Sequence, residues 1–153
     1  MLQKTLIIYQ SIHRGNTAKI AKVMAEQLNA DIKKPSEVKP DDIDKYDLIG
    51  FGSGIYNRKH HISLFKLLEA IQLQKNKKAF IFSTASISYK KELHKSLRQE
   101  LLLKGFDIVD EFICRGFMYY SFTKLFGGIN KNRPNDEDLA KAKKFAISVR
   151  DRF

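Results

Sequence analysis

The chain has one cysteine, no long apolar run and far fewer acidic than basic residues. The single Cys114 excludes an internal disulfide and any metal site built from clustered cysteines. Its place in a predicted strand indicates a buried thiol rather than a redox centre. No run is long enough to span a bilayer, and Met1–Tyr9 lacks the pattern of a signal peptide. We therefore expect a cytoplasmic protein.

The shortage of acidic residues leaves a formal net charge of +11, from 28 lysines and arginines against 17 aspartates and glutamates. Such a charge suits nucleic acid, an anionic membrane surface, an acidic protein or a carboxylate-bearing substrate. The lysines are dispersed, however, and no nucleic-acid-binding motif accompanies them. We expect no nucleic-acid partner, and a solvated basic surface accounts for most of the charge.

Short apolar runs alternate with helical patterns along the chain, which predicts one α/β domain over residues 1–153. The expected strands are Leu6–Tyr9, Ala30–Lys33, Asp47–Ser53, Ala79–Ser83 and Phe106–Cys114. This alternation is typical of a parallel sheet with helices on both faces. Ligands bind such sheets beyond the carboxyl ends of the strands. The loops to consider are therefore Gln10–Thr17, Ser53–His61 and Thr84–Tyr89.

The stretch Thr5–Thr17 (TLIIYQSIHRGNT) combines a buried strand, a short polar loop and the start of a helix. The helix start offers free backbone N–H groups and a positive dipole end, and Gly15 lets the backbone approach an anion. No lysine precedes Thr17, which excludes a nucleoside-triphosphate loop, and the lone glycine excludes a dinucleotide fingerprint. The side-chain donors are Ser11, His13, Asn16 and Thr17, and Arg14 adds charge. Together they predict a metal-free site for a phosphate monoester.

The loop Ser11–Thr17 (SIHRGNT) resembles the [ST]-x-[ST]-G-N-T phosphate loop of the flavodoxin family. It is one residue longer before GNT, so that His13 and Arg14 depart from the pattern. The segments Tyr46–Ile49 and Ala79–Phe82 also fall where that fold expects strands. The resemblance implies a three-layer sandwich, with a five-stranded parallel sheet in the order 2-1-3-4-5, and FMN as the cofactor.

The resemblance also implies which residues contact FMN. The phosphate would be held by Ser11, Ile12, His13, Arg14, Gly15, Asn16 and Thr17. One side of the isoalloxazine ring would be flanked by Ser53, Gly54, Ile55, Tyr56 and Asn57, and the other by Thr84, Ala85, Ser86 and Tyr89. The residue types fit, since Tyr56 and Tyr89 can stack on a flat ring and Gly54 supplies a flexible peptide that can bond to flavin N5. The third loop lacks the family's usual glycines and acidic residue.

Two features differ from the acidic electron carriers of this family. Basic residues follow the second and third loops at Arg58–His61 and at Lys90–Lys91. Positive charge favours an anionic reduced flavin, so we expect a hydroquinone that is a weaker reductant than that of an acidic flavodoxin. His60 and His61 are predicted to be basic rim residues at a helix start, because helix neighbours diverge by about 100° and no carboxylate or cysteine completes a metal site.

The second feature is an aromatic-rich segment, Gly116–Arg133, before the last helix. It is either a satellite core under a long loop or a lid, membrane-contact or partner surface. Its basic residues, Lys124, Lys131 and Arg133, would suit an anionic partner.

Three functions are consistent with these patterns. The first is an FMN-binding redox protein that passes electrons to a protein partner, which the basic rim predicts to be acidic. The second is suggested by resemblance to flavodoxin-like protoporphyrinogen dehydrogenases, which implies a tetrapyrrole substrate, a quinone acceptor and peripheral membrane contact. The third is a binding module without flavin, which the intact Gly15-Asn16-Thr17 argues against.

Overall fold

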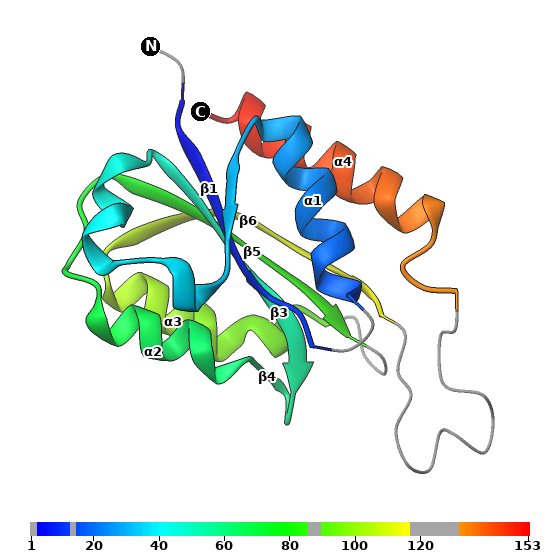
Figure 1. Cartoon of the computed structure of the whole chain (residues 1–153), viewed down its shortest axis with the longest axis horizontal. Helices are drawn as coiled ribbons and strands as arrows, with labels where there is room; N and C mark the ends of the chain where they lie inside the picture. The colour runs from blue at the N-terminus through cyan, green and yellow to red at the C-terminus, as the bar shows by residue number, and fades with distance from the viewer. Residues whose placement is uncertain (1–2, 13–14, 86–89, 117–131) are drawn as a thin grey trace.

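A computed structural model describes residues 3–12, 15–85, 90–116 and 132–153 (Figure 1). Within these residues the sheet consists of β1 (Thr5–Gln10), β2 (Asp31–Lys33), β3 (Leu48–Tyr56), β4 (Lys59–His60), β5 (Lys77–Ala85) and β6 (Phe106–Arg115). Its order is β2-β1-β3-β5-β6, and all pairings along that path are parallel. The predicted order of the parallel strands is thus confirmed. The short β4 is an addition, paired antiparallel to the end of β3.

Helices cover both faces of the sheet. The chain folds α1 (Asn16–Leu28) and α4 (Asp136–Asp151) onto one face, and α2 (Ile62–Ala70) and α3 (Lys95–Leu103) onto the other (Figure 1). The chain also forms three short 3-10 helices within the described residues, η1 (Pro35–Glu37), η2 (Pro40–Lys45) and η3 (Lys91–His94). In the part of the chain that the structure describes, no helix has both the length and the apolar character needed to cross a membrane.

Two hydrophobic cores lie on either side of the sheet. Side chains alternate along each central strand, so that Phe51 and Ile81 pack with α2 and α3, whereas Phe80 and Phe82 pack with α1 and α4. Strands buried on both faces need apolar residues at nearly every position, which explains the unbroken runs in the sequence.

Glycines in β3 make room for the aromatic residues of β5. A Cβ atom on Gly50 would lie 2.3 Å from the Phe80 ring, and one on Gly52 would lie 2.2 Å from the Phe82 ring. These glycines therefore serve packing. Gly105 follows Lys104, the C-cap residue of α3, and has a φ of 87°, as expected for a glycine that ends a helix.

Candidate functional site

The first and third candidate loops meet at the carboxyl end of the sheet. The Oγ1 atoms of Thr17 and Thr84 lie 2.9 Å apart, and both residues are buried. Gly116 closes this junction from β6, since its backbone N–H donates to the carbonyl oxygen of Ala85 at 3.2 Å. A Cβ atom on Gly116 would lie 2.9 Å from the Asn16 side chain, so a larger residue there would displace Asn16.

The start of α1 is suited to an anion. Gly15 adopts the left-handed conformation, with φ of 67°, and turns the chain into the helix without a side-chain cap. The first helical turn carries no acidic residue that would neutralise its positive end. The Ser11 Oγ atom is shielded from solvent and has no hydrogen-bond partner among the described residues. A phosphate oxygen would supply that partner, so this end of the site fits FMN.

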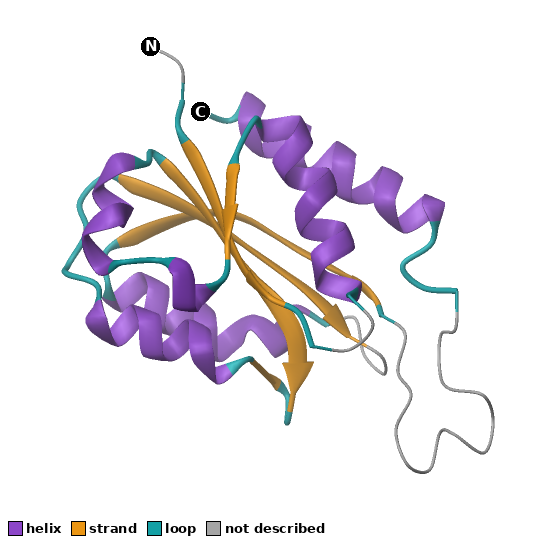
Figure 2. Ribbon diagram, in the orientation of Figure 1, coloured by secondary structure: helices purple, strands orange, loops and turns teal. Residues whose placement is uncertain are grey.

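The second loop is a β-hairpin rather than an open loop. The third strand continues to Tyr56, and Asn57 and Arg58 form a two-residue turn into β4 (Figure 2). Their φ angles are 50° and 64°, as a tight hairpin turn of this length requires. Gly54 lies inside the strand, paired with Thr84 in β5. The peptide in an unusual conformation is thus at Asn57 and Arg58, not at Gly54.

Ser53 fastens this hairpin to α2. Its buried hydroxyl donates to the carbonyl oxygen of Gly54 at 2.6 Å and accepts from the backbone N–H of His61 at 2.9 Å. Ile55 pairs with His60 in the two-stranded ladder. The hairpin is therefore held in place by contacts within the protein.

The prediction that both histidines are basic rim residues is wrong for His60. Its side chain is 3% exposed, and its Nε2 atom lies 3.1 Å from the carbonyl oxygen of Phe82. Burial, and then repulsion from His94, lowers the pKa of His60 to about 3. His61 does lie at the start of α2, where its Nδ1 accepts from the backbone N–H of Ser63 at 3.1 Å. Burial and the Lys66 charge lower its pKa too, so the positive charge after β3 belongs to Arg58 and Lys59.

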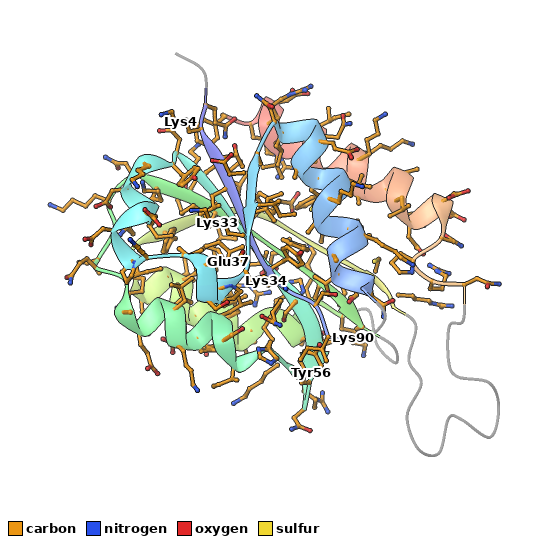
Figure 3. The ribbon with its side chains drawn as sticks, in the orientation of Figure 1. Lys4, Lys33, Lys34, Glu37, Tyr56 and Lys90 are labelled. Carbon is orange, nitrogen blue, oxygen red and sulfur yellow. The ribbon has the colours of Figure 1, made fainter. Side chains whose placement is uncertain are left out.

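An open pocket of about 790 Å³ lies between the first loop and the hairpin. Its lining residues are Ile12, Tyr56, Asn57, Lys59, His60, His61, Ile62 and Phe65. Ile12 and Ile62 are 52% and 58% exposed and give this pocket an apolar part suited to a flat ring. The contribution of α2 was missed by sequence reasoning, although an isoleucine at the exposed start of a helix was a usable signal. Figure 3 labels Tyr56 and Lys90, which lie at this end of the sheet.

The remaining predictions concern Cys114, metals and the extra segment. Cys114 is buried, which confirms the predicted buried thiol, and burial raises the pKa of this thiol to about 12. The described residues contain no group of three or more His, Cys, Asp or Glu arranged to hold a metal ion. Four candidate residues, His13, Arg14, Ser86 and Tyr89, lie outside the described residues, as do positions 117–131 of the aromatic-rich segment.

Comparison with known proteins places the chain in a family. A flavodoxin domain model matches residues 6–124. An uncharacterized protein of Methanocaldococcus jannaschii is 57% identical over 147 residues, covering 95% of this chain and 97% of that protein.

Solved structures share the fold. Oxidised flavodoxin 2 from Bacillus cereus has a TM-score of 0.74 at 22% identity, covering 98% of this chain and 99% of its own. A flavodoxin from the domain Archaea has a TM-score of 0.69 at 18% identity, with 97% of each chain covered. The rubredoxin oxygen:oxidoreductase of Desulfovibrio gigas has a TM-score of 0.72 at 20% identity, where the match spans 95% of this chain and 35% of that one. The chain belongs to the flavodoxin family, and FMN is its cofactor.

Proposed function

We propose that this protein is an electron carrier that holds FMN at the carboxyl end of the sheet and exchanges electrons with a protein partner. The observation that carries the proposal is that groups suited to a phosphate and a pocket suited to a ring lie next to each other at the carboxyl end of the sheet. The Ser11 hydroxyl, without a hydrogen-bond partner among the described residues, and the start of α1, which has no side-chain cap, lie at the two ends of the first loop. Ile12 of the same loop lines the pocket together with Tyr56. One part suits a phosphate and the other suits a flat ring.

In this proposal the three loops have separate roles. The phosphate is bound by the first loop, Ser11–Thr17, and by the N–H groups at the start of α1. Tyr56 stacks on the ring, while Ser53, Gly54, Ile55 and Asn57 shape the hairpin that carries it. Thr84 and Ala85, with Ser86 and Tyr89, close the other side. Bound FMN supplies reversible acceptance of electrons, and the protein supplies position and charge.

The basic rim suggests the chemistry of the partner. Arg58 and Lys59 lie at the hairpin and line or adjoin the pocket, and Lys90 follows the third loop. Exposed cations of this kind steer an acidic protein surface toward the ring and make association sensitive to salt. We therefore infer an acidic redox partner.

The experiment that tests the FMN site is a binding titration of the apoprotein with FMN, followed by flavin absorbance. Thr17→Val keeps the shape of the side chain but removes the hydroxyl next to Thr84. It should weaken FMN binding by roughly 1–3 kcal/mol, since it leaves a hydrogen bond unmade. The matched control Thr5→Val changes another buried threonine, which lies at the start of β1, at the opposite end of that strand from the proposed site. Equal FMN affinity in wild type and Thr17→Val would contradict the assignment of the phosphate loop.

A second function is favoured by the extent of the pocket. It continues beyond the FMN loops onto α2, where Ile62 and Phe65 offer an apolar floor and Lys59 a cation. That combination suits an organic substrate with an anionic group beside the flavin, such as a tetrapyrrole, with a quinone as acceptor. Oxidation of protoporphyrinogen with a quinone, lost in Ile62→Asp, would establish this enzyme. Inactivity of the FMN-loaded protein with both substrates would leave the electron carrier.

A further inference from the structure

A row of neighbouring polar side chains lies beside the carboxyl end of β5, on the α2 and α3 side of the sheet. The Oγ atom of Ser83 in β5 lies 2.7 Å from Nε2 of His94 in η3, and both residues are 0% exposed. The Nδ1 atom of His94 lies 3.8 Å from Oε1 of Glu111 in β6. Arg98 of α3 donates to both oxygens of Glu111, at 2.8 and 2.7 Å. The order Ser83, His94, Glu111, Arg98 thus leads from the strand end toward the surface.

The first three members have the order of a hydrolytic triad, but Ser83 cannot act as a nucleophile. Its side chain has no solvent exposure, and His94 contacts its oxygen atom. A substrate carbonyl would have no access to the hydroxyl. This row of side chains is therefore suited to holding or moving a proton.

His94 is able to hold a proton without losing a partner. A hydroxyl both donates and accepts, so Ser83 donates to a neutral Nε2 and accepts from a protonated one. The other nitrogen faces Glu111, which is a carboxylate at neutral pH. Burial alone would raise the pKa of Glu111, but the nearby His94 and the hydrogen bonds from Arg98 outweigh burial and lower it to about 2. A negative charge therefore already faces the imidazole.

The neighbouring His60 cannot take that role. Its ring lies 4.9 Å from the His94 ring between centroids. Its Nε2–H donates to the Phe82 carbonyl, and its Nδ1 has no hydrogen-bond partner among the described residues. The Nδ1 atom of His94 likewise has no hydrogen-bond partner among the described residues, but it lies within ion-pair distance of the Glu111 carboxylate, and no such ion pair is found for His60 among the described residues. The charged groups around His94 are Glu111, Arg98 beyond it, and Lys91 of its own 3-10 helix, which pairs with Asp110 at 3.6 Å.

We propose that His94 takes up a proton when the flavin of this protein is reduced. The inference rests on the FMN site proposed above, because Ser83 directly precedes Thr84 and Ala85 of the third loop. Two electrons from a reductant and one proton convert FMN to its anionic reduced form. A second proton from water adds to Nε2 of His94, and the Ser83 hydroxyl turns from donor to acceptor. The imidazolium then compensates the new negative charge on the flavin.

The test is the two-electron reduction potential of the FMN-loaded protein as a function of pH, with dithionite as reductant. Each proton taken up per two electrons changes the potential by about 30 mV per pH unit. Wild type should show two such protons over part of the range between pH 5 and 8, and His94→Gln should show one throughout. The control His60→Gln, which alters the adjacent ring, should keep the wild-type slope.

A second measurement uses the wild-type protein, so it remains possible even if His94→Gln does not fold. The His94 imidazole of the wild-type protein, followed by NMR, should bind its proton at least tenfold more tightly in reduced than in oxidised protein. Glu111→Gln should weaken proton binding in both states. If the protein binds FMN but its reduction potential changes equally with pH in wild type and His94→Gln, the proton uptake is overturned and the proposed function stands. Equal proton affinity of His94 in the two redox states would have the same meaning. Failure to bind FMN would overturn the proposed function and this inference together.

Discussion

Ser11 and Ser53 lie at the same edge of the sheet, yet their hydroxyl groups are in opposite situations. Ser11 follows β1, and its Oγ atom has no hydrogen-bond partner among the described residues, whereas Ser53 in β3 has two. The first loop thus contains a polar group that a ligand would satisfy. The hairpin is held in place without a ligand, because protein groups already satisfy its serine hydroxyl. One region is organised for binding and the other for holding an aromatic wall in position.

The largest expected effect is the loss of folding stability in acid, because acid weakens the contact that holds the hairpin. His60 fastens β4 to the Phe82 carbonyl as a neutral ring, with a pKa lowered to about 3 from 6.5. Between these values the unfolded chain binds more protons than the folded one, so stability falls as the pH falls below 6.5. The loss between pH 6.5 and 4.5 should be roughly 2–3 kcal/mol. Urea unfolding at several pH values measures it.

His60→Gln is the matched variant for this prediction. Glutamine retains an N–H donor for the Phe82 carbonyl but does not titrate. Its stability should change much less between pH 6.5 and 4.5 than that of wild type. The pKa of Glu111 is lowered to about 2, so its contribution is lost only at still lower pH. Parallel curves for the two proteins would show that His60 is not the acid-sensitive group.

The next effect concerns Ser53 itself. Ser53→Ala should lower the free energy of unfolding by about 1–3 kcal/mol, because the His61 N–H and the Gly54 carbonyl each lose a partner in a largely buried place. The exposed Ser36 in η1 provides a control, and Ser36→Ala should change stability by less than about 0.5 kcal/mol. Thermal or urea unfolding of both variants is sufficient, and equal effects would mean that the Ser53 hydroxyl does not fasten the hairpin.

Ser11→Ala should behave in the reverse manner. It removes a shielded hydroxyl without a partner among the described residues, so the apoprotein should be as stable as wild type or slightly more stable. FMN binding should weaken by roughly 1–2 kcal/mol, because a hydrogen bond to the phosphate is lost. Unfolding of the apoprotein and FMN titration separate the two effects. A less stable apoprotein with unchanged FMN affinity would show that Ser11 has a structural role like that of Ser53.

The same contrast explains how much the sequence predicted. The strand Leu6–Ile8 and the loop to Thr17 were predictable, since burial on both faces leaves an apolar run and a helix start shows in local residue types. The hairpin was not, because Asn57-Arg58 lacks the glycine typical of such turns. The burial of His60 depends on a carbonyl 22 residues away, and the link from Ser83 through His94 to Glu111 joins three separate elements. Contacts between residues that are far apart in the sequence cannot be predicted from the local pattern of residue types.

The smallest effect concerns the hairpin tip. Arg58 has a φ of 64°, a conformation that costs a non-glycine residue free energy. Arg58→Gly should therefore raise stability by roughly 0.5–1 kcal/mol, whereas Arg58→Ala removes the same charge and keeps the strain. Unfolding of the two variants isolates the backbone term, and equal stabilities would show that the turn is unstrained. If glycine is better for folding, the arginine at the tip is explained by its charge beside the pocket. The two variants should then raise the flavin's power as a reductant equally, because both remove one positive charge near the ring.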